Sequence, residues 1–370
     1  MLRKTLSGTA LFCLCLASAG PLPAANLKFG GATYAGDTRN ISVSKPAAVA
    51  VKRPPAASPA RPRTWDYPAG GLTSGVFYRT GGNSKPDSNL ATAAADFPGL
   101  GAFLWYKGLA ADPEGLPESF FAAAKAAKVI PQIGFESNSY DLPTMRRALV
   151  SKGILPETTQ AETRSNACYR QLAAWAVYLK DKGPVNFRPL SEMNDASGAW
   201  QLGKPGNTPK DFAAVWNGMH SLFDELGATN LRWTFTPLGV AGNPRLGLVR
   251  QALKSIPRGN IDNVGINPYA MQSGGSFESF KSLVDPWLDL FARTGHSVRP
   301  VISEMGVSNN PRGHNVEGNK DPDYLAPDTA KYKELDIRRA QWIRGAFAYA
   351  RGKKFASVTY FDQQGTCWSK

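Results

Sequence analysis

The chain has 370 residues, of which 42% are hydrophobic and 11% aromatic, and it carries a formal net charge of +14. The aromatic content excludes a chain that is disordered throughout, and four cysteines are too few for a disulfide-framework protein. Three histidines argue against a His-rich metal site, and the only long apolar run lies at the extreme N-terminus, which excludes a polytopic membrane protein.

Residues 1–25 have the pattern of an export signal. Arg3 and Lys4 give a positive start, an apolar stretch follows over residues 6–16, and residues 17–19 offer a cleavage site of the A-x-A type. We therefore predict export to the periplasm or the extracellular space, with no integral membrane span in the mature chain; an uncleaved anchor is the alternative. Cleavage would leave Cys168 and Cys367, and the sequence leaves open whether they pair.

Residues 26–65 form a basic segment rich in proline and alanine. Eleven of the eighteen residues from Pro46 to Arg63 are Pro or Ala and no hydrophobic period is visible, so we predict a disordered tether. The tether contributes +6 to the charge, and residues 66–370 contribute another +6. Because the remainder is only mildly basic for its size, we do not expect nucleic acid as a partner. The tether is either a solvated tail or weakly attracted to an anionic polymer, cell wall or membrane surface.

From Trp65 onward, short β-rich runs alternate with longer helical stretches. Eight runs are predicted strands: Gly75–Arg79, Ala102–Tyr106, Val129–Phe135, Val185–Ser191, Arg232–Thr236, Asn263–Asn267, Pro300–Ser303 and Ser357–Phe361. Several helical stretches begin with residues that favour helix starts, and two of them fall between the third and fourth strands. These stretches are Asn89–Asp96, Pro117–Lys128, Thr144–Lys152, Asn166–Lys182, Pro209–Leu226, Pro244–Ser255, Phe277–Thr294 and Thr329–Arg351.

This alternation over about 300 residues predicts an α/β fold of the (β/α)8 TIM-barrel type. An open doubly wound sheet is the alternative, but no G-x-G-x-x-G follows the first strand. Only nine residues follow Phe361, too few for a normal eighth helix. We therefore expect either a barrel that lacks this helix or an N-terminal segment that covers the gap.

Two glutamates end predicted strands and suggest the chemistry. Glu192 closes the fourth strand and Glu304 the seventh, each within Ser-Glu-Met after a run that begins with Arg-Pro. Catalytic groups of barrels sit at the C-terminal strand ends, and strands 4 and 7 lie nearly opposite each other. Two facing carboxylates suit cleavage of a glycosidic bond, one as acid/base and the other as nucleophile or water-positioning group.

The residues around these glutamates resemble clan A glycoside hydrolases, and family 26, the β-mannanases, most closely. Residues 187–194 (FRPLSEMN), with Trp200 shortly after, look like the acid/base segment of that family, and residues 300–306 (PVISEMG) look like its nucleophile segment. Residues 264–269 (VGINPY) resemble the sixth-strand segment. The resemblance implies that Glu192 is the acid/base, Glu304 the nucleophile and Tyr269 a hydrogen-bond partner of Glu304.

One position departs from the family pattern. Family 26 usually has His directly before the acid/base, and the wider clan usually has Asn, whereas this chain has Ser191. Serine has a shorter reach, so contacts near the glycosidic oxygen or the 2-hydroxyl group are expected to differ. The general chemistry stands, while the departure leaves room for a β-linked polymer other than mannan.

Further side chains near strand ends are candidates for binding substrate. Arg188 shares its strand face with Glu192, so it either holds a carboxylate ionised or forms a structural ion pair. Aromatic rings can stack on sugars or belong to the core, and acids and amides can bond hydroxyl groups. The full set is Arg188, Trp105, Tyr106, Glu136, Asn138, Ser191, Asn194, Trp200, Trp233, Asp362 and Trp368.

The sequence therefore predicts an exported, retaining, endo-acting glycoside hydrolase. We expect no cofactor and no metal, a monomer, and a polysaccharide partner for which an anionic polymer stays open. The alternatives are a non-catalytic polysaccharide-binding barrel, or a transglycosylase or lyase that acts on an exported cell-surface polymer.

Overall fold

The computed structural model describes residues 28–29, 32–33, 65–68, 71–79, 85–240, 242, 244–270, 272–273, 276–296, 298–307 and 330–363. The chain divides into two units, residues 1–53 and 54–370. In the first unit β1 (Lys28–Phe29) and β2 (Ala32–Thr33) form an antiparallel pair within the predicted tether. The predicted export signal lies outside the described residues.

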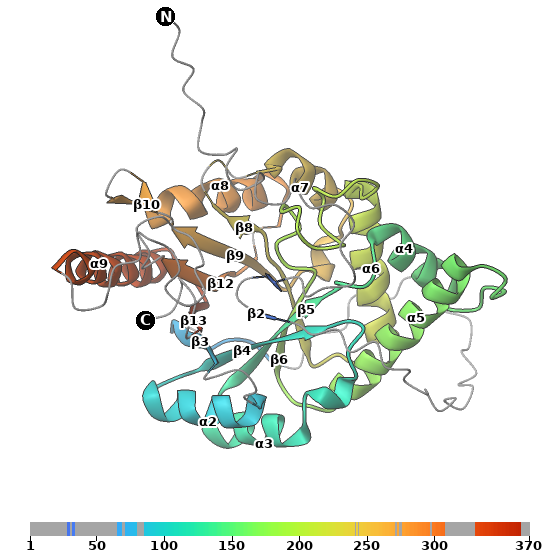
Figure 1. Cartoon of the computed structure of the whole chain (residues 1–370), viewed down its shortest axis with the longest axis horizontal. Helices are drawn as coiled ribbons and strands as arrows, with labels where there is room; N and C mark the ends of the chain where they lie inside the picture. Colours follow the sequence, from blue (N-terminus) through green and yellow to red (C-terminus); the bar gives the residue numbers. More distant parts are fainter. Residues whose placement is uncertain are drawn as a thin grey trace, which may run out of the picture. The chain divides into compact units, whose positions relative to one another are not determined.

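Eight parallel strands close into a barrel in the second unit (Figure 1). Around the barrel they are β3 (Thr73–Arg79), β4 (Ala102–Gly108), β5 (Ile130–Glu136), β6 (Val185–Pro189), β7 (Leu231–Phe235), β9 (Asn263–Ala270), β12 (Pro300–Val307) and β13 (Ser357–Gln363). Pairing of β13 with β3 completes the ring. Three short strands lie outside it: β8 (Leu238–Gly239), which pairs with β9, and the hairpin of β10 (Gln272–Ser273) and β11 (Ser276–Phe277). The predicted (β/α)8 barrel is therefore confirmed.

Helices follow the strands and lie around the barrel (Figure 1). They are α2 (Pro86–Asp96), α3 (Glu118–Ala127), α4 (Leu142–Ser151), α5 (Gln160–Leu179), α6 (Pro209–Glu225), α7 (Leu246–Leu253), α8 (Phe280–Arg293) and α9 (Ala330–Gly352), with 3₁₀ turns at Pro113–Gly115 and Arg258–Asn260. Capping hydrogen bonds from side chains determine where several helices begin. At the start of α5, for example, Thr159 and Glu162 form a capping box. The described residues contain no helix after β13. None of the helices within the described ranges is long and apolar enough to cross a membrane.

Aromatic side chains fill the layer between barrel and helices. Phe187 of β6 and Trp233 of β7 point outward, with ring centroids 5.1 Å apart. Trp216 and Phe223 of α6 pack on Trp233 at 5.7 and 5.5 Å. Rings of this size each bury about 150–250 Å², so this layer is a main source of stability. Cys168 of α5 is buried in the same core as a free thiol, and Cys367 lies outside the described residues.

Polar side chains fill the inside of the barrel. Gln132 Nε2 of β5 donates to Thr359 Oγ1 of β13 at 2.7 Å, and Asn186 Oδ1 of β6 accepts from Thr234 Oγ1 of β7. Because buried polar groups need partners, these bonds fix which face of each strand points inward. Because side chains alternate along a strand, residue 136 faces inward like Gln132 of β5, and residue 188 faces inward like Asn186 of β6. Both lie at the C-terminal mouth of the barrel.

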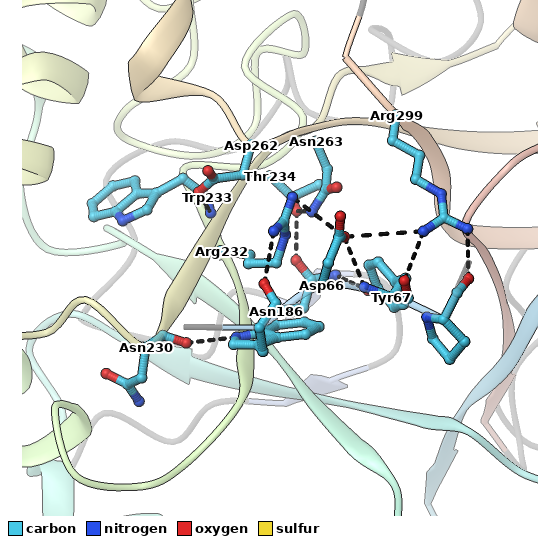
Figure 2. Close-up of polar contacts among 12 residues, drawn as sticks. Asp66, Tyr67, Asn186, Asn230, Arg232, Trp233, Thr234, Asp262, Asn263 and Arg299 are labelled. Atoms are coloured by element: carbon cyan, nitrogen blue, oxygen red, sulfur yellow. Dashed lines mark hydrogen bonds and ion pairs between the residues drawn. The ribbon is translucent and has the colours of Figure 1, made fainter. Parts of the chain in front are cut away.

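The segment Trp65–Pro68 packs on residues at the N-terminal ends of the strands. Figure 2 shows the polar contacts of Asp66 and Tyr67 in this segment. Tyr67 is 2% exposed and its hydroxyl accepts a hydrogen bond of 2.8 Å from Asn186 Nδ2. Arg299 donates to the carbonyl of Tyr67 at 2.9 Å, and Asp66 lies 3.4 Å from Arg232. The packed fold therefore includes Trp65, which the sequence pattern had placed in the tether. Because this segment covers the N-terminal end of the barrel, a functional site is expected at the C-terminal ends of the strands.

Candidate active site

Glu192 lies in a tight loop directly after β6. The strand ends at Pro189, two residues earlier than predicted, because Leu190 and Glu192 adopt left-handed backbone conformations with φ of 53° and 57°. Such conformations cost about 1–3 kcal/mol each for non-glycine residues and concentrate at functional sites. Backbone bonds hold the loop, since the Leu190 amide donates to Phe135 O at 2.8 Å and the Glu192 amide to Thr236 O at 2.7 Å.

Glu304 lies inside β12 rather than at its end. The strand was predicted to stop at Ser303, but it continues to Val307. Between Ile302 and Met305 it carries one residue more than its neighbour β13, which is a β-bulge. The bulge breaks the alternation, so Ser303 and Glu304 both turn inward: Ser303 Oγ lies 3.2 Å from Thr236 Oγ1, and Glu304 points at β6 and β9.

A single amide bridges the two carboxylates. Asn267 Nδ2 donates to Glu192 Oε1 at 2.9 Å and to Glu304 Oε1 at 2.8 Å. These two distances together limit the separation of the carboxylate oxygens to about 5.7 Å. Asn267 Oδ1 accepts from Arg188 at 3.4 Å, and this contact with an obligate donor fixes the amide so that its NH₂ faces the glutamates. Asn267 was not predicted as a site residue, although it lies two residues before Tyr269 on the same strand face.

Several side-chain donors hold Glu304, and the hydroxyl group of Tyr106 is one of them. Besides Asn267, the guanidinium of Arg188 pairs with Oε1 and the hydroxyl of Tyr269 donates to Oε2 at 2.6 Å. Arg188 is fully buried and also donates to Ser303 O at 3.2 Å. Burial acts to lower the pKa of Arg188, but the charge of Glu304 opposes it and the pKa is raised, so the arginine stays cationic. The carboxylate of Glu304 therefore has a fixed position and a compensated charge.

Glu192 has a different electrostatic environment. Burial and the negative charge of Glu304 raise its pKa to about 8, against a smaller lowering by the hydrogen bond from Asn267. At neutral pH Glu192 is mainly protonated, while Glu304 has its cationic partner. A protonated carboxyl group beside an ion-paired carboxylate can serve as acid and as nucleophile, respectively.

A third carboxyl group lies beside them. Glu136 ends β5, next to β6, and burial followed by the charge of Glu304 raises its pKa to about 7. Its neighbour Asn138, which is exposed, donates to Glu136 Oε2 at a long 3.4 Å.

Aromatic rings form the opposite side of the mouth. Phe77 of β3 and Phe361 of β13 stack with centroids 4.6 Å apart, and Tyr106 of β4 meets Phe77 edge-on at 5.4 Å. Tyr269 lies 6.1 Å from Phe361. Burial and the charge of Glu304 raise the pKa of Tyr106 well above its usual value, which keeps the phenol protonated. Phe77 and Phe361 were not predicted, and only strand alternation from a known register would have indicated them.

Three predicted substrate contacts have structural roles instead. Trp233 is fully buried among Phe187, Phe223 and Trp216, so no ring face is open to a sugar. Asn194 is fully buried and ties the loops after β6 and β7 together through both backbone groups of Leu238.

Trp200 is the third of these residues. It is 3% exposed and braces the Glu192 loop by donating from Nε1 to Ser191 O at 3.0 Å. Ser191 itself is 2% exposed. Trp105 is half-buried and stacks on Phe103 at 6.2 Å. The side chain of Asp362 and the whole of Trp368 lie outside the described residues.

Within the described ranges, no group of three His, Cys, Asp or Glu side chains is arranged to hold a metal ion. The functional groups that line this mouth are carboxyl, amide, guanidinium and phenol groups.

Comparison with known proteins gives the fold. Neither a protein-family model nor a curated protein matches the sequence. Among solved structures, the chain is similar to the catalytic domain of a GH26 endo-β-1,4-mannanase from Bacillus sp. JAMB-750, with a TM-score of 0.50, 15% identity, and 78% of this chain and 76% of that chain covered. The YdhT protein from Bacillus subtilis gives a TM-score of 0.50 and 16% identity over 80% of this chain and 81% of that one. An endo-β-1,4-xylanase of family GH10 from Gloeophyllum trabeum gives 0.45 and 13%, over 82% and 85%. At these identities the likeness shows the barrel fold alone.

Proposed function

We propose that the protein is an exported glycoside hydrolase that cleaves internal bonds of a β-linked polysaccharide with retention of configuration. The observation that carries the proposal is the shared contact of Glu192 and Glu304 with one nitrogen, Asn267 Nδ2. The two glutamates lie 75 and 37 residues from Asn267 along the chain. Packing alone gives no reason for them to converge on the mouth, since isolated buried carboxyl groups are costly.

The separation of the carboxyl groups supports retention. Retaining enzymes hold them about 5–5.5 Å apart, and inverting enzymes about 6.5–9.5 Å apart to admit a water molecule. The bridging amide holds Glu192 Oε1 and Glu304 Oε1 at most about 5.7 Å apart, and this limit is compatible with the retaining geometry.

The electrostatic environments of the two glutamates support one assignment of roles. Protonated Glu192 donates its proton to the leaving oxygen while the Glu304 carboxylate attacks the anomeric carbon, which gives a glycosyl ester on Glu304. The ionised Glu192 then takes a proton from water, and the resulting hydroxide equivalent displaces Glu304 and restores both groups. Arg188, Asn267 and Tyr269 orient Glu304 and stabilise it as the leaving carboxylate in the second step.

The substrate is proposed as a β-mannan-like polymer or an exopolysaccharide. The motif resemblance around Glu192 and Glu304 supports this class, and the pattern of residues 1–25 supports export. Residue Ser191, which stands where family 26 usually has His, sets this chain apart from mannanases at a position beside the acid/base.

The test is hydrolysis of a panel of β-mannan, β-glucan, β-xylan and acidic exopolysaccharides by the wild-type protein and two variants. We expect Glu192→Gln and Glu304→Gln each to lose about a thousandfold or more in kcat on the substrate that is cleaved. Glu225→Gln is the matched control, because this exposed residue ends α6 at the opposite end of the barrel. Unchanged turnover in either mouth variant would remove that residue from its role, and binding without any cleavage would favour a non-catalytic barrel.

A further inference from the structure

Glu136 faces the same mouth as the two proposed catalytic glutamates but has no role in the double displacement. Alternation along β5 sends it inward, because Gln132 of the same face bonds across the barrel to Thr359. The backbone anchors its position from both sides: the Leu109 amide donates to Glu136 O at 2.6 Å, and the Leu190 amide donates to the preceding carbonyl of Phe135. Glu136 is therefore a fixed carboxyl group beside the Glu192 loop.

Among the residues that the structure describes, none gives Glu136 a cationic partner of its own. Within the described part of the chain, its carboxylate accepts one long hydrogen bond from Asn138 and forms no ion pair. Arg188 is the cation whose charge acts on Glu136, and its guanidinium is bonded to Glu304, Ser303 and Asn267.

An aromatic ring lies next to Glu136. Tyr106 pairs in register with Gly134, two residues before Glu136 on the same strand face. A Cβ atom at Gly134 would lie 2.5 Å from the Tyr106 ring, so the missing side chain lets the ring lie directly against β5. A carboxylate beside an aromatic ring is an arrangement that binds ammonium groups through charge and cation–π attraction together.

From this arrangement, and resting on the function proposed above, we propose that the substrate carries a free primary amine and that Glu136 and Tyr106 bind its ammonium group. The substrate class is a β-linked polysaccharide that contains amino sugars without their N-acyl group. Glu136 is then the residue that sets specificity.

The alternatives fit the charges less well. A neutral hydroxyl group can donate one hydrogen bond to Glu136, but it brings no positive charge and leaves the repulsion between Glu136 and Glu304 unchanged. An ammonium group brings up to three donors and a positive charge, so it relieves that repulsion. A uronic acid would bring a further carboxylate close to Glu136 and Glu304, which argues against the anionic substrate that the sequence left open. The raised pKa of Glu136 agrees with a carboxylate that lacks such a partner when no substrate is bound.

The test compares matched substrates that differ only at the amine. Oligosaccharides of β-1,4-linked glucosamine and of β-linked galactosamine are offered to the wild-type protein as free amines and after N-acetylation, alongside β-mannan. We expect kcat/KM for one free-amine substrate to exceed that for its acetylated form at least tenfold. We also expect Glu136→Gln to reduce this ratio about 10- to 100-fold, as for the loss of a charge-assisted contact, whereas the exposed control Glu225→Gln leaves it unchanged.

The outcomes separate this inference from the proposed function. If mannan or the acetylated forms are cleaved as well as the free amines, the amine inference is wrong and the hydrolase stands. If nothing is cleaved, the hydrolase is in doubt, and calorimetric binding of the same oligosaccharides to Glu304→Gln decides the inference alone. Tighter binding of a free amine that is lost in the Glu136→Gln, Glu304→Gln double variant supports it, and equal binding of amine and acetylated forms overturns it.

Discussion

Neutralising Glu192 should remove activity and at the same time stabilise the protein at alkaline pH. In the folded state the pKa of Glu192 is raised to about 8 by burial and by Glu304, whereas in the unfolded chain it returns to about 4.5. The folded state therefore binds the proton more tightly. As pH rises from about 4.5 to about 8, the unfolded chain loses this proton first, so the wild-type protein loses stability over this window.

The size of the effect follows from the pKa shift. Each pKa unit corresponds to about 1.4 kcal/mol, so the shift of Glu192 amounts to a few kcal/mol above pH 8. Glu192→Gln does not titrate and avoids this loss, which is expected to raise Tm at pH 9 by about 5 °C or more relative to the wild type. At pH 4.5 the difference between the two proteins should be small.

The assay is thermal unfolding of both proteins at pH 4.5, 7 and 9, with Glu304→Gln as the contrasting variant. The latter is expected to be destabilised, because it leaves the buried guanidinium of Arg188 without its negative partner. A Glu192→Gln protein that gains no stability between pH 4.5 and 9, or a Glu304→Gln protein that gains as much, would refute the electrostatic assignment of the two carboxyl groups.

Three further predictions concern the groups around the glutamates. Activity of the wild-type protein is expected to fall as pH rises through about 8, because the proton donor is lost; a kcat/KM profile that stays flat to pH 10 would contradict this. Asn267→Ala should lower kcat/KM about 10- to 100-fold and move the alkaline fall in activity to higher pH, because the hydrogen bond from the Asn267 side chain lowers the pKa of Glu192. A fall at the same pH as in the wild type would show that Asn267 does not act on Glu192. Tyr67→Ala should lower the free energy of unfolding by about 3–5 kcal/mol, measured by urea denaturation, with kcat retained in the folded protein, because Tyr67 packs at the closed end of the barrel; a selective loss of kcat would contradict the separation of the two ends.

The sequence was sufficient to predict the barrel, and it also singled out Glu192 and Glu304, which the fold brings together and whose catalytic roles stay predictions. Alternating strands and helices have a strong pattern, and the eight predicted strands correspond to the eight barrel strands. Glu192 and Glu304 were found because charged residues directly after apolar runs are unusual. The limits of those strands were less accurate: a left-handed turn at Leu190 shortens β6 and a bulge lengthens β12 past Glu304, and both features depend on pairing with neighbouring strands.

Side-chain direction was the part that the sequence could not supply. Trp233 directly precedes the inward-facing Thr234 in β7, so its side chain points outward. It packs against the helices and cannot stack on a sugar in the mouth. Asn267 and Phe361 were not predicted, because their roles at the mouth follow from contacts with residues far away along the chain. Trp200 and Asn194 are near Glu192 in sequence, and in the structure both hold the loop that carries Glu192.

The stereochemical course of cleavage tests the central claim most directly. The substrate found in the panel is hydrolysed in an NMR tube, and the anomeric proton of the first product formed is observed before mutarotation. A β-configured product is expected, because carboxylate oxygens within about 5.7 Å of each other favour a covalent intermediate on Glu304. An α-configured first product would show inversion and would contradict the roles of Glu192 as acid/base and Glu304 as nucleophile.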